Sequence, residues 1–192
     1  MGTHEERRIL LVRHGRTALN AEGRLRGRAD PPLDDVGIAQ AEATAAALSG
    51  VGLGEAVSSP LQRAVRTAQI IAAASAVPHR VDAAFDDRDY GPWTGQVKAD
   101  VVARWGGIDA APGVEPEADV LERALRGLDA LADAADAAPV AVVTHDAVIR
   151  PVLARIRPCV DAVVDTGSWA EIAREAGVWR LVSFDDTAGS SS

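Results

Sequence analysis

The sequence has a single cysteine, Cys159, few aromatic residues and no long apolar run. One cysteine excludes an internal disulfide framework. The charged N-terminal residues lead into an apolar run of four residues, Ile9 to Val12, which is too short for a signal peptide or a membrane-spanning helix. We therefore expect a cytoplasmic protein with no membrane partner.

Positive charge is also scarce, and it is unevenly placed. The chain has 20 Lys and Arg residues against 28 Asp and Glu residues, a net charge of -8, which argues against nucleic-acid binding because such binding needs a basic face. Five arginines nevertheless crowd one early segment, namely Arg13, Arg16, Arg24, Arg26 and Arg28. The segment is either a solvated arginine-rich loop or a local anion site, since guanidinium groups fit phosphate oxygens.

A length of 192 residues with 47% hydrophobic content favours one domain over residues 1–192. Short apolar runs predict strands over residues 7–14, 55–60, 139–145 and 177–184. Apolar residues at helical spacing predict helices over residues 33–50, 61–76, 118–136 and 146–156. Loops are predicted at residues 106–116 and around His79, and a frayed polar tail at 185–192.

The alternation of strands and helices predicts an α/β fold with a largely parallel sheet covered on both faces. Ligands of such sheets bind beyond the carboxyl ends of the strands. His14 and His145 each end an apolar strand, so both are expected at that rim. Arg13 precedes His14, and Arg63 falls in the first turn of a helix that starts at the same rim. Together these four side chains would form a pocket for a dianionic phosphoryl group.

Phosphoryl transfer needs positive charge on the equatorial oxygens, a nucleophile and protonation of the leaving oxygen. A neutral imidazole can attack phosphorus and so divide one displacement into two easier ones. The candidates for the acid are Asp86, Asp87 and Asp89, in the stretch FDDRDYGPWTG. A solvated acidic turn is the alternative interpretation of that stretch.

Five stretches, taken in order, resemble the successive motifs of the histidine phosphatase superfamily, which includes the cofactor-dependent phosphoglycerate mutases. They are RHGRTALN, RGRADPPLDDVGIAQAE, SSPLQRAVRTA, DDRDYGPWTG and VVTHDAVIRPVL, and they cover roughly residues 9 to 155. The resemblance implies a three-layer α/β/α sandwich with a mostly parallel central sheet. It implies no cofactor and no metal, with a small-molecule phosphomonoester as the partner.

The resemblance also implies roles for individual residues. His14 would be the phosphorylated nucleophile, Asp87 the acid, and Arg13, Arg63 and His145 the rest of the phosphate pocket. Asn20, Arg26 and Gly27 match positions that flank the substrate. Tyr90 and Lys98 are further candidates for substrate binding, Lys98 being the lone lysine in a stretch, GQVKAD, that looks like a mutase pattern. Residues 85–116 would cap the substrate.

Three positions depart from the family pattern. Asp146 follows the second histidine where the family usually has glycine, and we expect it to point away from the phosphate and cap the next helix. The common GGES turn reads GVEP, which keeps only Glu115. The acid Asp87 is one methylene shorter than the usual glutamate.

The sequence favours a phosphomonoester hydrolase acting through a phosphohistidine. A mutase is the alternative within the family, but the paired arginines expected in the stretch WGGIDAAPGVEP are missing. His145 and Asp146 also form the HD pair that some metal-dependent phosphohydrolases use, although four histidines are few for such a site. A non-catalytic phosphoester-binding module is the non-enzyme alternative. The identity of the substrate and the oligomeric state, a homodimer included, stay open.

Overall fold

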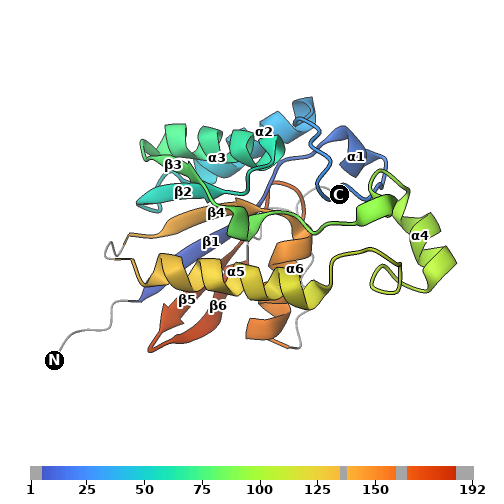
Figure 1. Ribbon diagram of the computed structural model, residues 1–192. Coiled ribbons are helices and arrows are strands. Elements are labelled where there is room, and N and C mark those ends of the chain that lie inside the picture. The colour runs from blue at the N-terminus through green and yellow to red at the C-terminus, as the bar shows by residue number, and fades with distance from the viewer. Residues whose placement is uncertain (1–5, 135–137, 159–163, 185–192) are drawn as a thin grey trace.

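The computed structural model describes residues 6–134, 138–158 and 164–184. Its centre is a six-stranded sheet in the order β3-β2-β4-β1-β5-β6 (Figure 1). The strands are β1 (Arg7–Arg13), β2 (Glu55–Ser58), β3 (His79–Val81), β4 (Val140–Thr144), β5 (Trp169–Glu175) and β6 (Val178–Phe184). The first four are mutually parallel, whereas β5 and β6 run antiparallel to their neighbours. The sheet is therefore mostly parallel, as the sequence predicts.

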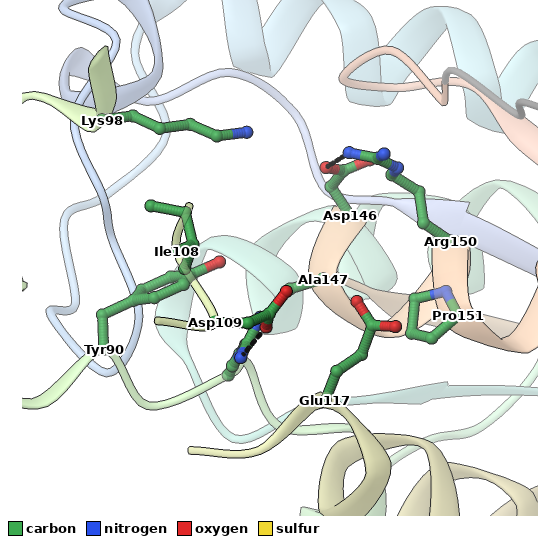
Figure 2. Close-up of a pocket in the computed structure, with 10 residues that line it drawn as sticks. Tyr90, Lys98, Ile108, Asp109, Glu117, Asp146, Ala147, Arg150 and Pro151 are labelled. Atoms are coloured by element: carbon green, nitrogen blue, oxygen red, sulfur yellow. Dashed lines mark hydrogen bonds and ion pairs between the residues drawn. The ribbon is translucent and has the colours of Figure 1, made fainter. Parts of the chain in front are cut away.

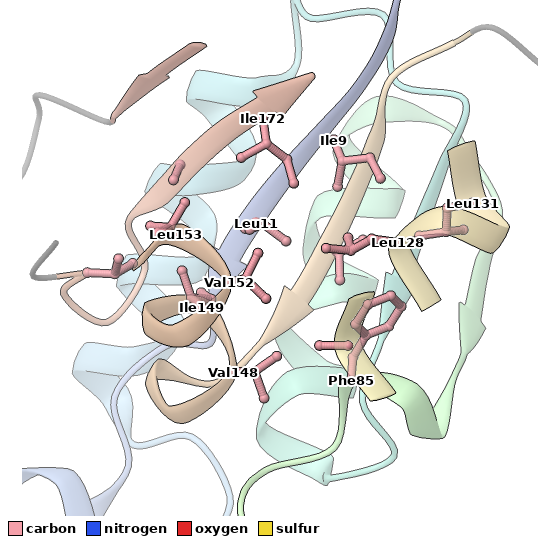
Figure 3. Close-up of a cluster of buried hydrophobic side chains, with 14 of the residues drawn as sticks. Ile9, Leu11, Phe85, Leu128, Leu131, Val148, Ile149, Val152, Leu153 and Ile172 are labelled. Atoms are coloured by element: carbon pink, nitrogen blue, oxygen red, sulfur yellow. The ribbon is translucent and has the colours of Figure 1, made fainter. Parts of the chain in front are cut away.

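Two pairs of helices cover the two faces of the sheet. The residues of β1 alternate between the faces, as strand geometry requires. Leu10 and Val12 pack with α2 (Asp35–Leu48) and α3 (Gln62–Ser75), while Ile9 and Leu11 pack with α5 (Glu117–Ala132) and α6 (Asp146–Ile156). Figure 3 shows the second of these cores, in which Val152 and Leu128 face the strands. The result is the expected three-layer α/β/α sandwich.

The strand pairing brings together the two strand ends that carry histidine. β1 and β4 are direct neighbours, with Arg13 opposite Thr144 at their carboxyl ends. The next residues along the chain are His14 and His145. The ring centroids of these two histidines lie 5.1 Å apart.

A smaller group of elements lies beyond this end of the sheet (Figure 1). It includes the short helix α1 (Ala18–Ala21), the 3-10 turn Gly91–Trp93 and α4 (Lys98–Trp105), whereas the 3-10 turn Ala83–Phe85 packs against the sheet, where Phe85 joins the core. Leu25, Val101 and Ala111 form the apolar centre of the smaller group, and Trp93 packs edge-on against Trp105 with centroids 5.6 Å apart. The role of residues 85–116 as a substrate cap stays a prediction.

The structure departs from the predicted elements in three places. β5 and α4 were not expected. His79 begins β3 and does not lie in a loop, because its backbone pairs with Ala56 of β2. Cys159 and residues 185–192 fall outside the described residues. None of the helices in the described ranges is long and apolar enough to span a bilayer, and the cytoplasmic location stays a prediction.

Candidate active site

His14 is fully buried at the end of β1, and its tautomer is fixed by the neighbouring backbone. Its Nδ1 lies 2.6 Å from the carbonyl oxygen of Gly15, so Nδ1 carries the hydrogen and donates it. Burial, together with the charges of Arg63 and Arg26, lowers the pKa of His14 well below its usual value. The ring is therefore neutral near pH 7, with an unprotonated Nε2. That atom has no hydrogen-bond partner among the described residues.

The backbone beside His14 is held by an unusually close approach of helix α2. An added Cβ on Gly15 would lie 2.2 Å from the carbonyl oxygen of Gly37, and one on Gly37 would lie 2.0 Å from the carbonyl oxygen of Arg16. Both carbonyl oxygens belong to the main chain, which cannot move away without shifting the packed segments. Glycine is required at both positions for this packing, which fixes the segment that follows β1.

His145 ends β4 and contacts a serine from the neighbouring strand end. Its Nε2 lies 2.7 Å from Oγ of Ser59, which also accepts a long hydrogen bond from the backbone N–H of Leu61. Burial and the charge of Arg63 lower the pKa of His145 well below its usual value. The Ser59 hydroxyl can donate to Nε2 or accept from it, and Nδ1 of the ring faces Asp87 Oδ2 at 3.6 Å.

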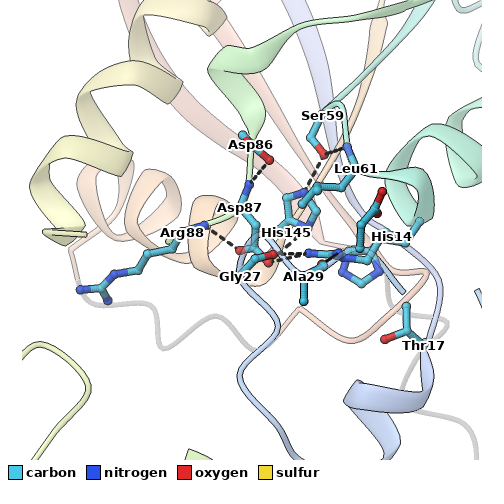
Figure 4. A network of polar contacts seen from close by, with 12 residues as sticks. His14, Thr17, Gly27, Ala29, Ser59, Leu61, Asp86, Asp87, Arg88 and His145 are labelled. Atoms are coloured by element: carbon cyan, nitrogen blue, oxygen red, sulfur yellow. Dashed lines mark hydrogen bonds and ion pairs between the residues drawn. The ribbon is translucent and has the colours of Figure 1, made fainter. Parts of the chain in front are cut away.

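Arg63 and Asp87 form a fully buried ion pair beside the two histidines (Figure 4). Arg63, from the first turn of α3, donates to Asp87 Oδ2 at 2.9 Å and to the backbone carbonyl oxygens of Gly27 and Ala29. Burial raises the pKa of Asp87, although the charges of Arg63 and Arg26 oppose the rise. A raised pKa lets this carboxyl hold a proton at higher pH than a free aspartate does.

Of the five early arginines, Arg13 and Arg26 lie close to this cluster. Both act on the pKa of His14, and Arg26 also acts on the pKa values of Asp87 and His145. The other three form ion pairs elsewhere: Arg16 with Asp34, Arg24 with Glu22 and Arg28 with Asp89. Two of the five arginines in this segment thus lie where they could bind an anion, and the other three do not.

The segment that carries Asp87 is held by residues that the sequence does not single out. Arg123 of α5 donates to the backbone carbonyl oxygens of Ala84, Asp86 and Asp87. It also forms an ion pair with Glu115 at 3.3 Å. The Glu115 carboxylate in turn accepts from the backbone N–H of Asp89 at 2.9 Å. Glu115, the residue kept from the GGES turn, therefore braces the acid loop.

Several buried nitrogens of the cluster make no hydrogen bond among the described residues. They are His14 Nε2, His145 Nδ1 and the Nε atoms of Arg13, Arg26 and Arg63. Unpartnered buried donors are costly. A site that gathers three guanidinium groups around two neutral imidazoles is suited to an anion with several oxygens, such as a phosphoryl group. Within the described residues, no group of three His, Cys, Asp or Glu side chains is placed to hold a metal ion.

The comparison with protein families agrees with this geometry. The model of the histidine phosphatase superfamily, branch 1, matches residues 9–187. The chain belongs to the histidine phosphatase superfamily. Members of this superfamily are in general phosphatases and mutases.

Some of the similar relatives and solved structures carry phosphatase names. The Mycobacterium tuberculosis bifunctional protein Rv2228c is 36% identical over 165 residues, which make up 81% of this chain and 44% of that protein. The chain thus spans less than half of that relative's length. The Bacillus subtilis protein named uncharacterized phosphatase PhoE is 32% identical over 148 residues, covering 77% of this chain and 76% of that one. The structure of a mycobacterial glucosyl-3-phosphoglycerate phosphatase complexed with VO3 has a TM-score of 0.83 at 26% identity, over 93% of this chain and 98% of that chain.

The residues predicted to flank the substrate lie in three places. Gly27, with a φ of 50°, accepts from Arg63 and lies against Tyr90. Asn20 is engaged in the capping box of α1, where its Oδ1 accepts from the backbone N–H of Thr17 at 3.1 Å. Tyr90 and Lys98 line a separate cavity of about 310 Å³ (Figure 2). Burial raises the pKa of the Tyr90 hydroxyl, which therefore stays protonated.

Asp146 does not behave as the sequence predicts. His145 is the N-cap residue of α6, and Asp146 is its first helical residue, without a capping hydrogen bond. Its carboxylate lies 4.0 Å from Nη1 of Arg13 and 3.8 Å from Nη1 of Arg150, and it lines the cavity in Figure 2. The expectation that it points away and caps the helix is wrong, because two guanidinium groups attract it toward the site.

Proposed function

We propose that the protein hydrolyses phosphomonoesters through a phosphohistidine at His14. The observation that carries the proposal is the state of this imidazole. Its Nδ1 hydrogen is held by the Gly15 carbonyl oxygen, and its pKa is lowered well below the usual value. Its Nε2 therefore presents a lone pair in a buried pocket that Arg13, Arg26 and Arg63 surround.

The first step forms a bond between His14 Nε2 and phosphorus and breaks the bond from phosphorus to the ester oxygen. Asp87 gives its proton to the departing oxygen, and its raised pKa supports that role. Arg13, Arg63 and His145 stabilise the charge on the remaining phosphoryl oxygens.

In the second step a water molecule attacks the phosphorus of the phosphohistidine. Asp87, now ionised, accepts a proton from that water as the bond from phosphorus to Nε2 breaks. The products are inorganic phosphate and the starting states of His14 and Asp87. Hydrolysis needs an acid that becomes a base, and one carboxyl serves both steps.

The decisive test traps the intermediate. A phosphomonoester labelled in its phosphoryl group should label the protein in an acid-labile, alkali-stable form. His14→Ala should abolish both the label and turnover, because no other side chain carries the nucleophile. The control is His79→Ala. It removes a histidine of β3 that contacts Ser58 of β2 and lies outside the proposed site. Label that persists in His14→Ala, or that appears on serine or aspartate, overturns the proposal.

The same assay separates the alternatives. A mutase would pass the phosphoryl group to a second phosphoglycerate and release little inorganic phosphate, whereas a hydrolase releases it stoichiometrically. A non-catalytic binding module would bind phosphate without turnover and without label.

Chelation tests the reaction against the metal-dependent alternative. The guanidinium groups of Arg13, Arg26 and Arg63 would supply the positive charge at the phosphoryl oxygens. In other phosphohydrolases a divalent ion supplies that charge. We expect kcat/KM to stay unchanged in excess chelator. A rate that collapses on chelation and returns with magnesium or manganese would favour the HD interpretation of His145 and Asp146.

A further inference from the structure

The cavity beside the phosphate pocket is lined by opposite charges in equal number. Arg88, Lys98 and Arg150 contribute the positive charges, and Asp109, Glu117 and Asp146 contribute the negative ones. One residue of this lining lies close to the phosphate site, because Asp146 directly follows His145 and its carboxylate lies 4.0 Å from Arg13. A phosphomonoester with its phosphoryl group at His14 would therefore direct its alcohol portion toward this cavity.

Most of the positive charge in the cavity is already paired. Arg88 lies 2.5 Å from Asp109, and Arg150 lies 3.8 Å from Asp146. Lys98 and Glu117 make no ion pair within the described ranges, and Figure 2 shows both beside the cavity. The lining thus carries no net positive charge that would favour a second anionic group on the substrate.

Asp146 borders the cavity and lies close to Arg13, so the alcohol portion of an ester bound at His14 would come near its carboxylate. A carboxylate there accepts hydrogen bonds from hydroxyl groups and repels another carboxylate. Hydroxyl groups can also accept from Lys98 and from the guanidinium of Arg150, so a polyhydroxy compound can satisfy both kinds of lining.

We propose that Asp146 makes the enzyme selective for phosphomonoesters of uncharged polyhydroxy alcohols, and against esters that carry a carboxylate near the phosphate. The inference rests on the proposed function, since it concerns the alcohol portion of the substrate that His14 attacks. Asp146 is here a specificity-determining residue, and the chemistry at His14 and Asp87 does not require it.

The test uses a matched pair of esters, glycerol 3-phosphate and 3-phosphoglycerate, which differ in a hydroxymethyl group against a carboxylate. Each is measured as a substrate by kcat/KM and as an inhibitor of p-nitrophenyl phosphate hydrolysis by Ki. Like charges a few ångströms apart repel each other, and a tenfold preference corresponds to about 1.4 kcal/mol of such repulsion. We therefore expect glycerol 3-phosphate to be favoured about tenfold in the wild type by at least one of these measures.

Two substitutions should move this ratio in opposite directions. Asp146→Asn removes the repelling charge and releases Arg13 and Arg150, so the preference should shrink to about threefold or reverse. Arg150→Gln removes a positive charge that partly neutralises the Asp146 carboxylate, so the preference for glycerol 3-phosphate should become larger. The control is Asp119→Asn, which removes the same charge from the exposed side of α5 and should leave the ratio unchanged.

The outcomes separate the two proposals. An enzyme that hydrolyses p-nitrophenyl phosphate but treats the two esters equally, or whose ratio is unchanged in Asp146→Asn, keeps the proposed function and overturns the role of Asp146. Equal losses on both esters in Asp146→Asn would assign it a structural role and also overturn the inference. A protein that hydrolyses none of the three compounds contradicts the proposed function, and the inference falls with it.

Discussion

At the scale of single residues, the site depends on two pKa shifts of opposite direction. Burial lowers the pKa of His14 and raises that of Asp87, because each group is favoured in its neutral form. The neutral imidazole is the nucleophile and the neutral carboxyl is the acid. As pH falls through the lowered pKa of His14 the nucleophile is lost, and as pH rises through the raised pKa of Asp87 the acid is lost. We therefore expect an acidic to neutral optimum.

Replacing Asp87 by asparagine tests that assignment. Asp87→Asn should slow esters of poor leaving groups by roughly a hundredfold or more. It should cost far less with p-nitrophenyl phosphate, whose leaving group departs without a proton, and the basic limb of the kcat profile should disappear. Equal losses on both kinds of ester would indicate a structural role. That result would move the acid role to Asp86 or Asp89, although these carboxylates accept from the backbone N–H groups of Asp87 and Gly91.

At the scale of elements, the placement of the acid depends on helix α5. Arg123 is the link, because its guanidinium holds three carbonyl oxygens of the acid loop. Arg123→Met keeps the apolar stem and removes the donors, so unfolding should cost about 1–3 kcal/mol less than in the wild type. Turnover of poor leaving groups should fall more than that of p-nitrophenyl phosphate.

The matched control lies on the same helix. Arg126 is exposed and pairs with Glu122, one turn away, so Arg126→Met should change stability by less than about 0.5 kcal/mol. Denaturant unfolding and kcat on the two esters measure both variants. If Arg123→Met behaves like Arg126→Met, α5 does not position Asp87.

Elements also explain which parts of the site the sequence could predict. His14 and His145 were predictable because strand ends of a parallel sheet share one rim. Arg123 was not, because it acts on backbone atoms that are distant in sequence and gives no residue pattern. β5 was missed because WAEIARE contains helix-favouring Ala, Glu and Arg, yet pairing with β1 and burial of Ala170 and Ile172 override that preference.

At the scale of the whole molecule, the fold gathers arginine side chains at one site although the chain as a whole is negatively charged. The chain carries a net charge of -8, yet Arg13, Arg26 and Arg63 converge on one buried pocket. Burial lowers the pKa of both Arg13 and Arg63, which measures the cost of gathering them there. The sequence could not predict that the Asp146 carboxylate lies near these arginines. The position of this side chain depends on where the fold places Arg13 and Arg150.

An anion that fills the pocket should therefore stabilise the folded state, since the unfolded chain has no such site. Inorganic phosphate at a hundred times its Kd should add about 2.7 kcal/mol, which for this chain length corresponds to a Tm increase of roughly 5–10 °C. Arg26→Met should reduce the increase by about half or more, because Arg26 lies beside His14 and Asp87. Arg28→Met is the matched control, since that arginine is exposed and its nearest ion-pair partner is Asp89 at 3.7 Å. Thermal unfolding in phosphate and in sodium chloride of equal ionic strength measures the effect. An equal gain in chloride, or an unchanged gain in Arg26→Met, would show that phosphate acts on the surface charge and not in the pocket.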